Sequence, residues 1–292
     1  MRTVRTDLAM ESHRLWQESA GKTTTLQGVK AVDGESGGFP THRVDILDRE
    51  GEKALGKPRG TYVTLDISQH RKKGFAGAAE ALAGLLAPMV PEEGPVLVAG
   101  LGNAAMTPDA LGHETVKHLL VTRHLGTLLP TLRPVSALAA GVLGTTGMEA
   151  AEWVRGVAAR VQPAAVIIVD ALAARDLERL CTTVQLSDTG LIPGSGVGNH
   201  RMALNRDTLG VPVISMGVPT VVDAATVARD MLRRSGAEER ESAALQGLGS
   251  NFFVTPDNID QQVGWLGKIL GYGITLALQP ELAVDDVTAL LE

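Results

Sequence analysis

Short apolar runs, separated by polar segments that contain glycine or proline, dominate the middle of the chain. The most continuous runs cover residues 96–101, 165–169 and 212–216, and each has the length of a strand. A wholly apolar run of this kind is typical of a strand that is buried on both faces of a parallel sheet. We therefore expect these three runs to form the central strands of a sheet.

Weaker alternating patterns predict further strands, and helical periods lie between them. The further strands are expected at residues 60–68, 135–139 and 182–186. The helices are expected at residues 74–87, 107–122, 147–161, 171–180, 224–234 and 256–278, and from 284 onwards. Strands that alternate with helices predict a three-layer α/β fold, with a mostly parallel sheet and helices on both of its faces.

Two parts of the chain lack this alternation. Residues 1–58 are polar and weakly periodic, so we expect an N-terminal arm with irregular elements. Residues 236–250 are polar and contain glycine, which indicates a surface excursion. The full length, 1–292, is short enough for both parts to belong to one domain.

Composition narrows the class of protein. Hydrophobic residues make up 44% of the chain and charged residues 21%, which predicts a packed core. The net charge of -6 argues against a nucleic-acid partner, because phosphate binding needs a basic surface. The first residues do not form a signal peptide, and no apolar stretch reaches the about 18 residues that span a bilayer. We expect a cytoplasmic protein without a membrane partner.

The chain contains one cysteine, Cys181. A single thiol cannot form an internal disulfide, so a disulfide-stabilised secreted scaffold is excluded. Because Cys181 ends an amphipathic stretch, we expect a packed thiol rather than a catalytic nucleophile.

Two aspartates follow predicted strands. Asp109 comes after the strand at 96–101 and a short loop, and Asp170 directly follows the strand at 165–169. Right-handed crossovers bring the carboxyl ends of parallel strands to one rim of the sheet, which is where ligands bind. Two neighbouring carboxylates do not both ionise easily, so the pair can hold one proton and work as acid and base.

Each of these aspartates also has a simpler interpretation. Asp109 is placed where an acid often only complements the dipole of a helix, and Asp170 where it often only caps one. Asp188 follows a third predicted strand and begins an Asp-Thr-Gly triplet, which also occurs in retropepsin-like aspartic peptidases. Those proteins are all-β, so in an α/β chain we expect Asp188 to fix a loop or to support the site.

A glycine-rich loop at residues 193–199 is the main candidate for substrate binding. The candidate residues in it are Gly194, Ser195, Gly196, Gly198 and Asn199. Its backbone N–H groups are suited to hold a phosphate or a peptide carbonyl. The G-x-G-x-G spacing, without a helix directly after it, does not fit a dinucleotide site.

Histidines near Asp109 give only a weak metal signal. His113 and His118 are five residues apart, whereas the zinc motif H-E-x-x-H separates its histidines by four, so the two rings splay around the helix. We expect surface or partly buried histidines there. His124 follows the same predicted helix and is a candidate for a supporting role.

Several sequence blocks together carry a family likeness. They cover residues 4–9 (VRTDLA), 100–112 (GLGNAAMTPDALG), 122–125, 134–137, 169–175, 188–199 (DTGLIPGSGVGN), 217–224 and 251–256. The blocks resemble the germination protease family, spore endopeptidases that degrade small acid-soluble spore proteins when spores germinate. The likeness extends over nearly the whole chain, and the number of blocks makes it specific.

The resemblance implies roles for particular residues. The family's two essential aspartates fall on Asp109 and Asp170. The implied fold is phosphorylase/hydrolase-like and is similar to the hydrogenase-maturation peptidases, in which a G-x-G-N loop, ending here at Asn103, leads to an acid six residues later. The corresponding acids of those relatives bind a metal ion. A metal-independent pair without a cofactor is favoured here, and a divalent metal at the same acids is the alternative.

The resemblance also implies partners and regulation. It implies small acid-soluble spore proteins as substrates, a location in the spore core, and a homo-oligomer, specifically a tetramer. It further implies a zymogen whose propeptide precedes the Arg-Thr-Asp-Leu segment, although only residues 1–4 precede Arg5 here. A non-catalytic protein that binds small spore proteins is the alternative from a different class.

Overall fold

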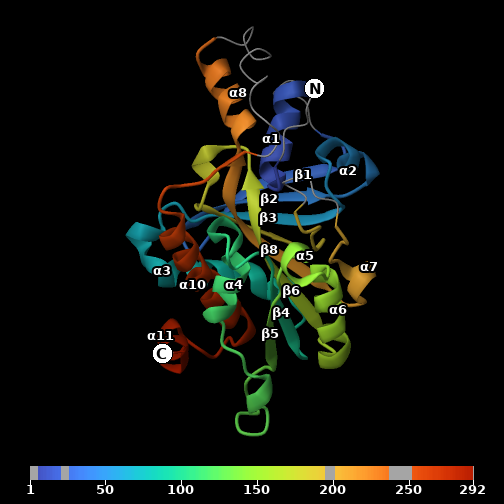
Figure 1. Cartoon of the computed structure of the whole chain (residues 1–292), viewed down its shortest axis with the longest axis vertical. Coiled ribbons are helices and arrows are strands. Elements are labelled where there is room, and N and C mark those ends of the chain that lie inside the picture. The colour runs from blue at the N-terminus through green and yellow to red at the C-terminus, as the bar shows by residue number, and fades with distance from the viewer. Residues whose placement is uncertain (1–5, 21–25, 195–200, 237–251, 292) are drawn as a thin grey trace.

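The computed structural model describes four stretches of the chain, which are residues 6–20, 26–194, 201–236 and 252–291. Within them one sheet runs through the molecule, with helices packed on its faces (Figure 1). The strand order is β1-β2-β3-β7-β8-β6-β4-β5, and the short β9 pairs with β8. The strands are β1 (Val29–Ser36), β2 (Phe39–Ile46), β3 (Gly60–Asp66), β4 (Val96–Gly100), β5 (Val135–Ala139), β6 (Ala165–Ala174), β7 (Thr183–Ser187), β8 (Val213–Asp223) and β9 (Phe253–Val254).

The helices differ widely in length. The α-helices are α1 (Ala9–Ala20), α2 (Arg49–Leu55), α3 (His70–Leu86), α4 (Leu111–Lys117), α5 (Leu143–Thr146), α6 (Ala150–Val161), α7 (Arg206–Leu209), α8 (Ala224–Arg234), α10 (Ile259–Leu278) and α11 (Val284–Leu291). Short 3₁₀ turns are η1 (Ala87–Met89), η2 (Thr107–Asp109), η3 (Arg123–Leu125) and η4 (Leu177–Arg179). No helix in the described stretches is long and apolar enough to cross a bilayer.

The three predicted central strands lie side by side as β8, β6 and β4, in parallel register. Their side chains alternate between two cores. Ile167 packs with α3, α4 and α10 on one face, and Ile168 packs with α6 on the other face. Both isoleucines are fully buried, which contributes about 1.5–3 kcal/mol for each side chain. The prediction of central strands is confirmed, and so is the α/β class with helices on both faces.

The sheet is mixed rather than mostly parallel. Strands β8, β6, β4 and β5 are parallel, whereas β1, β2, β3 and β7 join this half in antiparallel pairs. Gly37 and Gly38 form the two-residue turn between β1 and β2, with φ of 55° and 78°. A loop this short joins only antiparallel strands, and positive φ values at both positions suit glycine.

The prediction of irregular elements over residues 1–58 is therefore wrong. This segment contributes α1, the β1–β2 hairpin and α2. Strand β1 lies at the edge of the sheet and is largely exposed, which explains why its sequence is polar. Only Phe39, Val44 and Ile46 of β2 give the hairpin a buried face.

Of the predicted helices, the one at 171–180 is wrong, and the one at 107–122 is longer than the structure shows. Residues 171–174 continue β6, because their backbone pairs with β8 up to Ala174 and Val222, and only the turn η4 follows. The predicted helix at 107–122 is replaced by η2 and the short α4. Just after α4, the N–H of Leu120 donates to Thr275 Oγ1 of α10 instead of continuing a helix.

The remaining expectations hold where the structure describes the chain. The predicted strands at 60–68, 135–139 and 182–186 correspond to β3, β5 and β7, and the other predicted helices correspond to α3, α6, α8, α10 and α11. Cys181 is buried and forms no disulfide, and burial raises the pKa of its thiol to about 11. The prediction of a packed thiol is thus confirmed. The expected excursion at 236–250 falls almost entirely outside the described residues.

Candidate active site

Asp109 lies in η2, at the end of the loop that follows β4. The start of this loop, at Gly102, passes very close to η2. A Cβ on Gly102, whose φ is +112°, would lie 1.9 Å from the carbonyl oxygen of Asp109. The N–H of Asn103 donates to Asp109 Oδ2 at 2.8 Å, and the Thr220 hydroxyl of β8 donates to the Pro108 carbonyl at 2.7 Å. The loop and β8 together fix the position of Asp109.

Asp170 lies within β6 rather than at its end, and its exposed fraction is only 7%. The N–H of Ala171 donates to its Oδ1 at 3.0 Å. Asp170 pairs with Gly217 of β8, where a Cβ would lie 2.5 Å from the Asp170 carbonyl oxygen. A glycine at this position lets the two strands approach closely around the acid.

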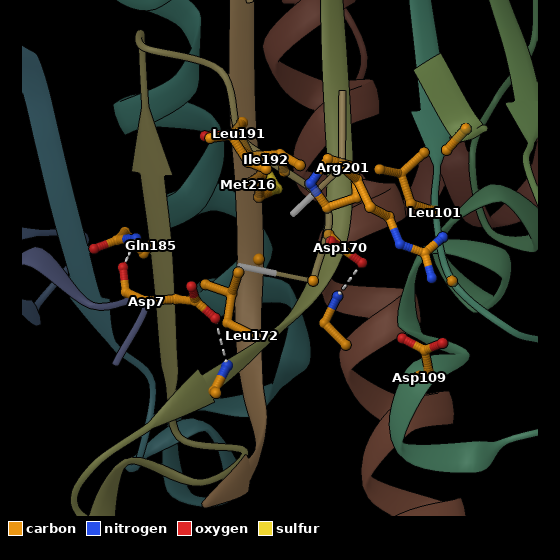
Figure 2. A pocket seen from close by; sticks show the side chains of 18 of the residues that line it. Asp7, Leu101, Asp109, Asp170, Leu172, Gln185, Leu191, Ile192, Arg201 and Met216 are labelled. Carbon is orange, nitrogen blue, oxygen red and sulfur yellow. Dashed lines mark hydrogen bonds between the residues drawn. The ribbon is translucent and has the colours of Figure 1, made fainter. Parts of the chain in front are cut away.

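The two aspartates come from neighbouring strands, because β4 and β6 pair directly. Both line one pocket of about 640 Å³, a size typical of ligand sites. Figure 2 shows them in this pocket, with apolar side chains around them. These include Leu101, Leu172, Leu191, Ile192 and Met216. The expectation that one rim of the sheet brings Asp109 and Asp170 together agrees with this geometry.

Five charged side chains line the pocket in the described part of the chain. They are Asp7, Lys57, Asp109, Asp170 and Arg201. With all five ionised, the three acids exceed the two bases by one negative charge. A single proton on the acids balances the charge of the site, which is the state expected of a pair that shares a proton.

The two carboxyl groups have different environments. Burial raises the pKa of Asp170 well above its ordinary value, and the charges of Asp109 and Asp7 raise it further. Burial also raises the pKa of Asp109, but the Asn103 N–H, His113 and Arg201 oppose this shift. Both shifts are upward, and the deeper burial of Asp170 favours its protonated form more strongly.

Arg201 interacts electrostatically with both acids. Its side chain extends toward Asp109 in Figure 2. Sequence reasoning missed Arg201, although it follows the glycine-rich loop by two residues, and it also missed Asp7 and Lys57. Asp7 belongs to a block that resembles the family, and this was the one available signal for it.

The other predicted site residues lie in different places. Asn103 holds Asp109 through its backbone, and Gly194 lines the pocket. Asp188 is exposed and accepts a hydrogen bond from the N–H of Thr61 at 2.8 Å, so it fixes the β3–β7 junction. His124 is exposed in η3 and does not line the pocket. Ser195, Gly196, Gly198 and Asn199 lie outside the described residues.

The described residues do not fit a resident metal ion. No three His, Cys, Asp or Glu side chains come together in the described stretches. Catalytic zinc sites use three protein ligands, whereas the pocket offers two adjacent carboxylates. The positive charge of Arg201 near both of them also disfavours a divalent cation. His113 and His118 are half-buried, as the sequence predicts.

Comparison with known proteins defines the class of protein. The profile of the germination protease family matches residues 6–243. Germination proteases of Clostridium perfringens, Caldanaerobacter subterraneus subsp. tengcongensis and Bacillus velezensis are 40%, 41% and 43% identical to this chain. The alignments cover 100%, 99% and 97% of this chain and 100%, 98% and 95% of the relatives. These matches make the chain a peptide-bond hydrolase.

More specifically, the chain belongs to the germination protease family and is thus an endopeptidase of spore germination. Among solved structures, the [NiFe] hydrogenase maturation protease HycI from Thermococcus kodakarensis matches with 15% identity and a TM-score of 0.37. This match covers 65% of the chain and 98% of HycI.

Proposed function

We propose that the protein is an endopeptidase that degrades small acid-soluble spore proteins in the cytoplasm of the spore core, and that Asp109 and Asp170 promote the attack of water. The observation that carries this proposal is that Asp109, from the loop after β4, and Asp170, from the neighbouring strand β6, line one pocket in unequal environments. Family membership supports the substrate class.

In the proposed reaction, ionised Asp109 accepts a proton from the water that attacks the peptide carbonyl carbon. Protonated Asp170 donates its proton to the substrate, so that the peptide nitrogen leaves as an amine. Proton transfer from Asp109 back to Asp170 restores the starting state. This division of roles follows the environments of the acids, because the more deeply buried Asp170 holds its proton more tightly.

Two further groups are placed to stabilise the transition state. The guanidinium of Arg201 faces the pair and offsets negative charge that develops on the substrate carbonyl oxygen. Gly194 lines the pocket with a φ of +71°, a conformation that exposes backbone without a side chain. We assign it the contact with the substrate backbone.

The test compares Asp109→Asn and Asp170→Asn with the parent protein, using a purified small acid-soluble spore protein as substrate. Each variant should lose activity by about 10²-fold or more, because each removes an acid or a base from the reaction. The double variant should be little worse than either single one, because the pair acts as a unit.

Asp48→Asn is the matched control for this test. Asp48 accepts hydrogen bonds from the backbone of α2 outside the pocket, and asparagine preserves them. It should leave activity unchanged. Substantial activity in either single active-site variant would contradict the aspartate mechanism. A parent protein that binds the substrate but yields no fragments would instead support the non-catalytic binding protein.

The same family relationship leads us to propose a homo-oligomer, specifically a tetramer. Sedimentation of the purified chain tests this assembly independently of activity, and a monomeric mass would contradict it.

A further inference from the structure

The N-terminal segment forms one wall of the active-site pocket. The N–H of Asp7 donates to the Ala173 carbonyl of β6 at 2.9 Å, and the N–H of Ala173 donates back to Asp7 Oδ2 at 2.8 Å. Ala173 lies at the β-bulge where the register between β6 and β8 shifts. Bulges of this kind redirect side chains beside active sites. Here the bulge brings the N-terminal segment against the strand that carries Asp170.

Long polar side chains hold this segment through its backbone. Lys57 Nζ donates to the Asp7 carbonyl at 2.8 Å, and Gln185 Nε2 donates to the same oxygen at 2.9 Å. Gln185 Oε1 also accepts the N–H of Ala9 at 2.7 Å. We call Lys57 and Gln185, which both donate to the Asp7 carbonyl, the clamp. The clamp holds the Asp7 backbone, and the residue lines the pocket.

A second anchor of the N-terminal segment is Glu11, which is buried. It accepts hydrogen bonds from the N–H groups of Arg175 and Asp176 and from the Thr6 hydroxyl.

The carboxylate of Asp7 thus forms part of the same pocket as the catalytic pair. Figure 2 shows Asp7 on the far side of Leu172 from Asp170, and all three residues line the pocket. In such surroundings, charges interact over longer distances than they do in water. A fixed negative charge at this position favours the neutral form of Asp170.

We propose that Asp7 is a positioning residue of the active site, a third carboxylate whose fixed charge keeps the shared proton of the pair on Asp170. The proposal rests on the proposed function of Asp109 and Asp170. Asp7 does not touch the reacting atoms; it acts through Asp170, and the clamp by Lys57 and Gln185 keeps it in place.

Other charged groups act on this arrangement. Asp109 from η2 reinforces the effect of Asp7 on Asp170, and Arg201 opposes it. Lys57 interacts electrostatically with both Asp7 and Glu11. Burial lowers the pKa of Lys57, so its charge is less strongly held than that of an exposed lysine. Tyr62 also lines the pocket, and its pKa is raised to about 12, so it stays neutral.

Asp7→Asn tests the proposal, because asparagine can still accept the N–H of Ala173 but carries no charge. Removing a negative charge lowers the pKa of Asp170, so the proton needed for catalysis is lost at lower pH. The alkaline limb of kcat/KM against pH should therefore move to lower pH by about 0.5–1.5 units, the range expected for one charge at a partly buried site. The substrate is again a purified small acid-soluble spore protein.

Asp7→Glu is the complementary variant. It keeps the charge but disturbs the hydrogen bond to Ala173, so it should lower kcat/KM while the alkaline limb stays near its parental position. A limb that does not move in Asp7→Asn, or that moves equally in both variants, would overturn the proposal and leave Asp7 a purely structural role. This comparison needs only the residual activity of folded protein, which circular dichroism verifies.

Asp170→Asn, measured in the same assay, separates the two proposals. If Asp170→Asn remains active, the proposed function fails, and the role of Asp7 fails with it. If Asp170→Asn is inactive while Asp7→Asn keeps the alkaline limb of kcat/KM at its parental pH, only the role of Asp7 is overturned. A shifted limb in Asp7→Asn together with an inactive Asp170→Asn supports both.

Discussion

Asp109 and Asp170 carry the same functional group but differ in how the chain holds them. Asp170 is embedded in a strand with 7% of its surface exposed, whereas Asp109 lies half-buried in a 3₁₀ turn. The deeper position penalises the charged form more strongly. Two identical residues thereby obtain opposite roles in the proposed reaction, one as acid and one as base.

The burial of Asp170 should also cost stability. Its pKa is raised in the folded protein, so folding is favoured below the ordinary carboxyl pKa, and this contribution is lost as the pH rises through the folded value. Asp170→Asn removes the buried charge, so its Tm should exceed that of the parent at pH 8 by a few degrees, since each pKa unit is worth about 1.4 kcal/mol.

This stabilisation should fade as the pH falls toward 4, where Asp170 of the parent is protonated. Calorimetry across this pH range provides the measurement. A Tm difference that is independent of pH would show that the charge of Asp170 is not what destabilises the fold.

Metal removal should have no effect on activity. Among the described residues no third His, Cys, Asp or Glu lies close enough to the two acids to complete a metal site, and Arg201 adds a positive charge. Dialysis against a chelator should therefore leave the rate of fragment formation unchanged within twofold. Lost activity that returns on addition of a divalent cation would contradict this expectation.

At the scale of elements, the close contact of β6 with β8 places Asp170. Gly217→Ala would put a Cβ 2.5 Å from the Asp170 carbonyl oxygen, so the strands must move apart. We expect a loss of about 1–3 kcal/mol in unfolding free energy, typical of overpacking in a core, together with lower activity. Urea unfolding and the fragment assay measure the two effects.

Gly156→Ala provides the matched control. Gly156 is exposed within α6, and a Cβ there would meet no atom within 4 Å. It should stabilise the protein by about 0.5–1 kcal/mol through helix propensity, without changing activity. Equal stability of Gly217→Ala and the parent would mean that the strands adjust without cost.

Sequence reasoning succeeded where burial alone decides the structure. Residues 165–169 are apolar on both faces, so a buried strand was predictable. The next residues, Ala171 to Ala174, favour a helix by composition, and only their pairing with β8 makes them a strand. The hairpin of β1 and β2 was missed because an edge strand with one exposed face carries little apolar signal.

The same limit applies to the site. Asp109 and Asp170 were selected from the sequence because each follows a buried apolar run, and these two runs form the neighbouring strands β4 and β6. Asp7 is held at the pocket by Ala173, 166 positions away, and Lys57 by its bond to the Asp7 carbonyl, 50 positions away, and no local pattern encodes such contacts.

For the whole molecule, the pocket lies where the two kinds of strand pairing meet. Asp170 lies in the parallel strand β6 and Asp109 follows the parallel strand β4, whereas the antiparallel half supplies Tyr62, Gln185 and Ser187 to the same pocket. Ligand sites often occur where the topology of an α/β sheet changes. The long antiparallel extension therefore shapes the pocket as well as the edge of the sheet.

Asp7 lines the pocket but is synthesised long before the residues that hold it there. Asp7 leaves the ribosome first, but Ala173, Gln185 and the β8 partner of Asp170 follow only after most of the protein has been made. Since chains grow at about 5–20 residues per second, many seconds separate these events. A nascent chain therefore has no complete pocket before the residues of β8 have been made.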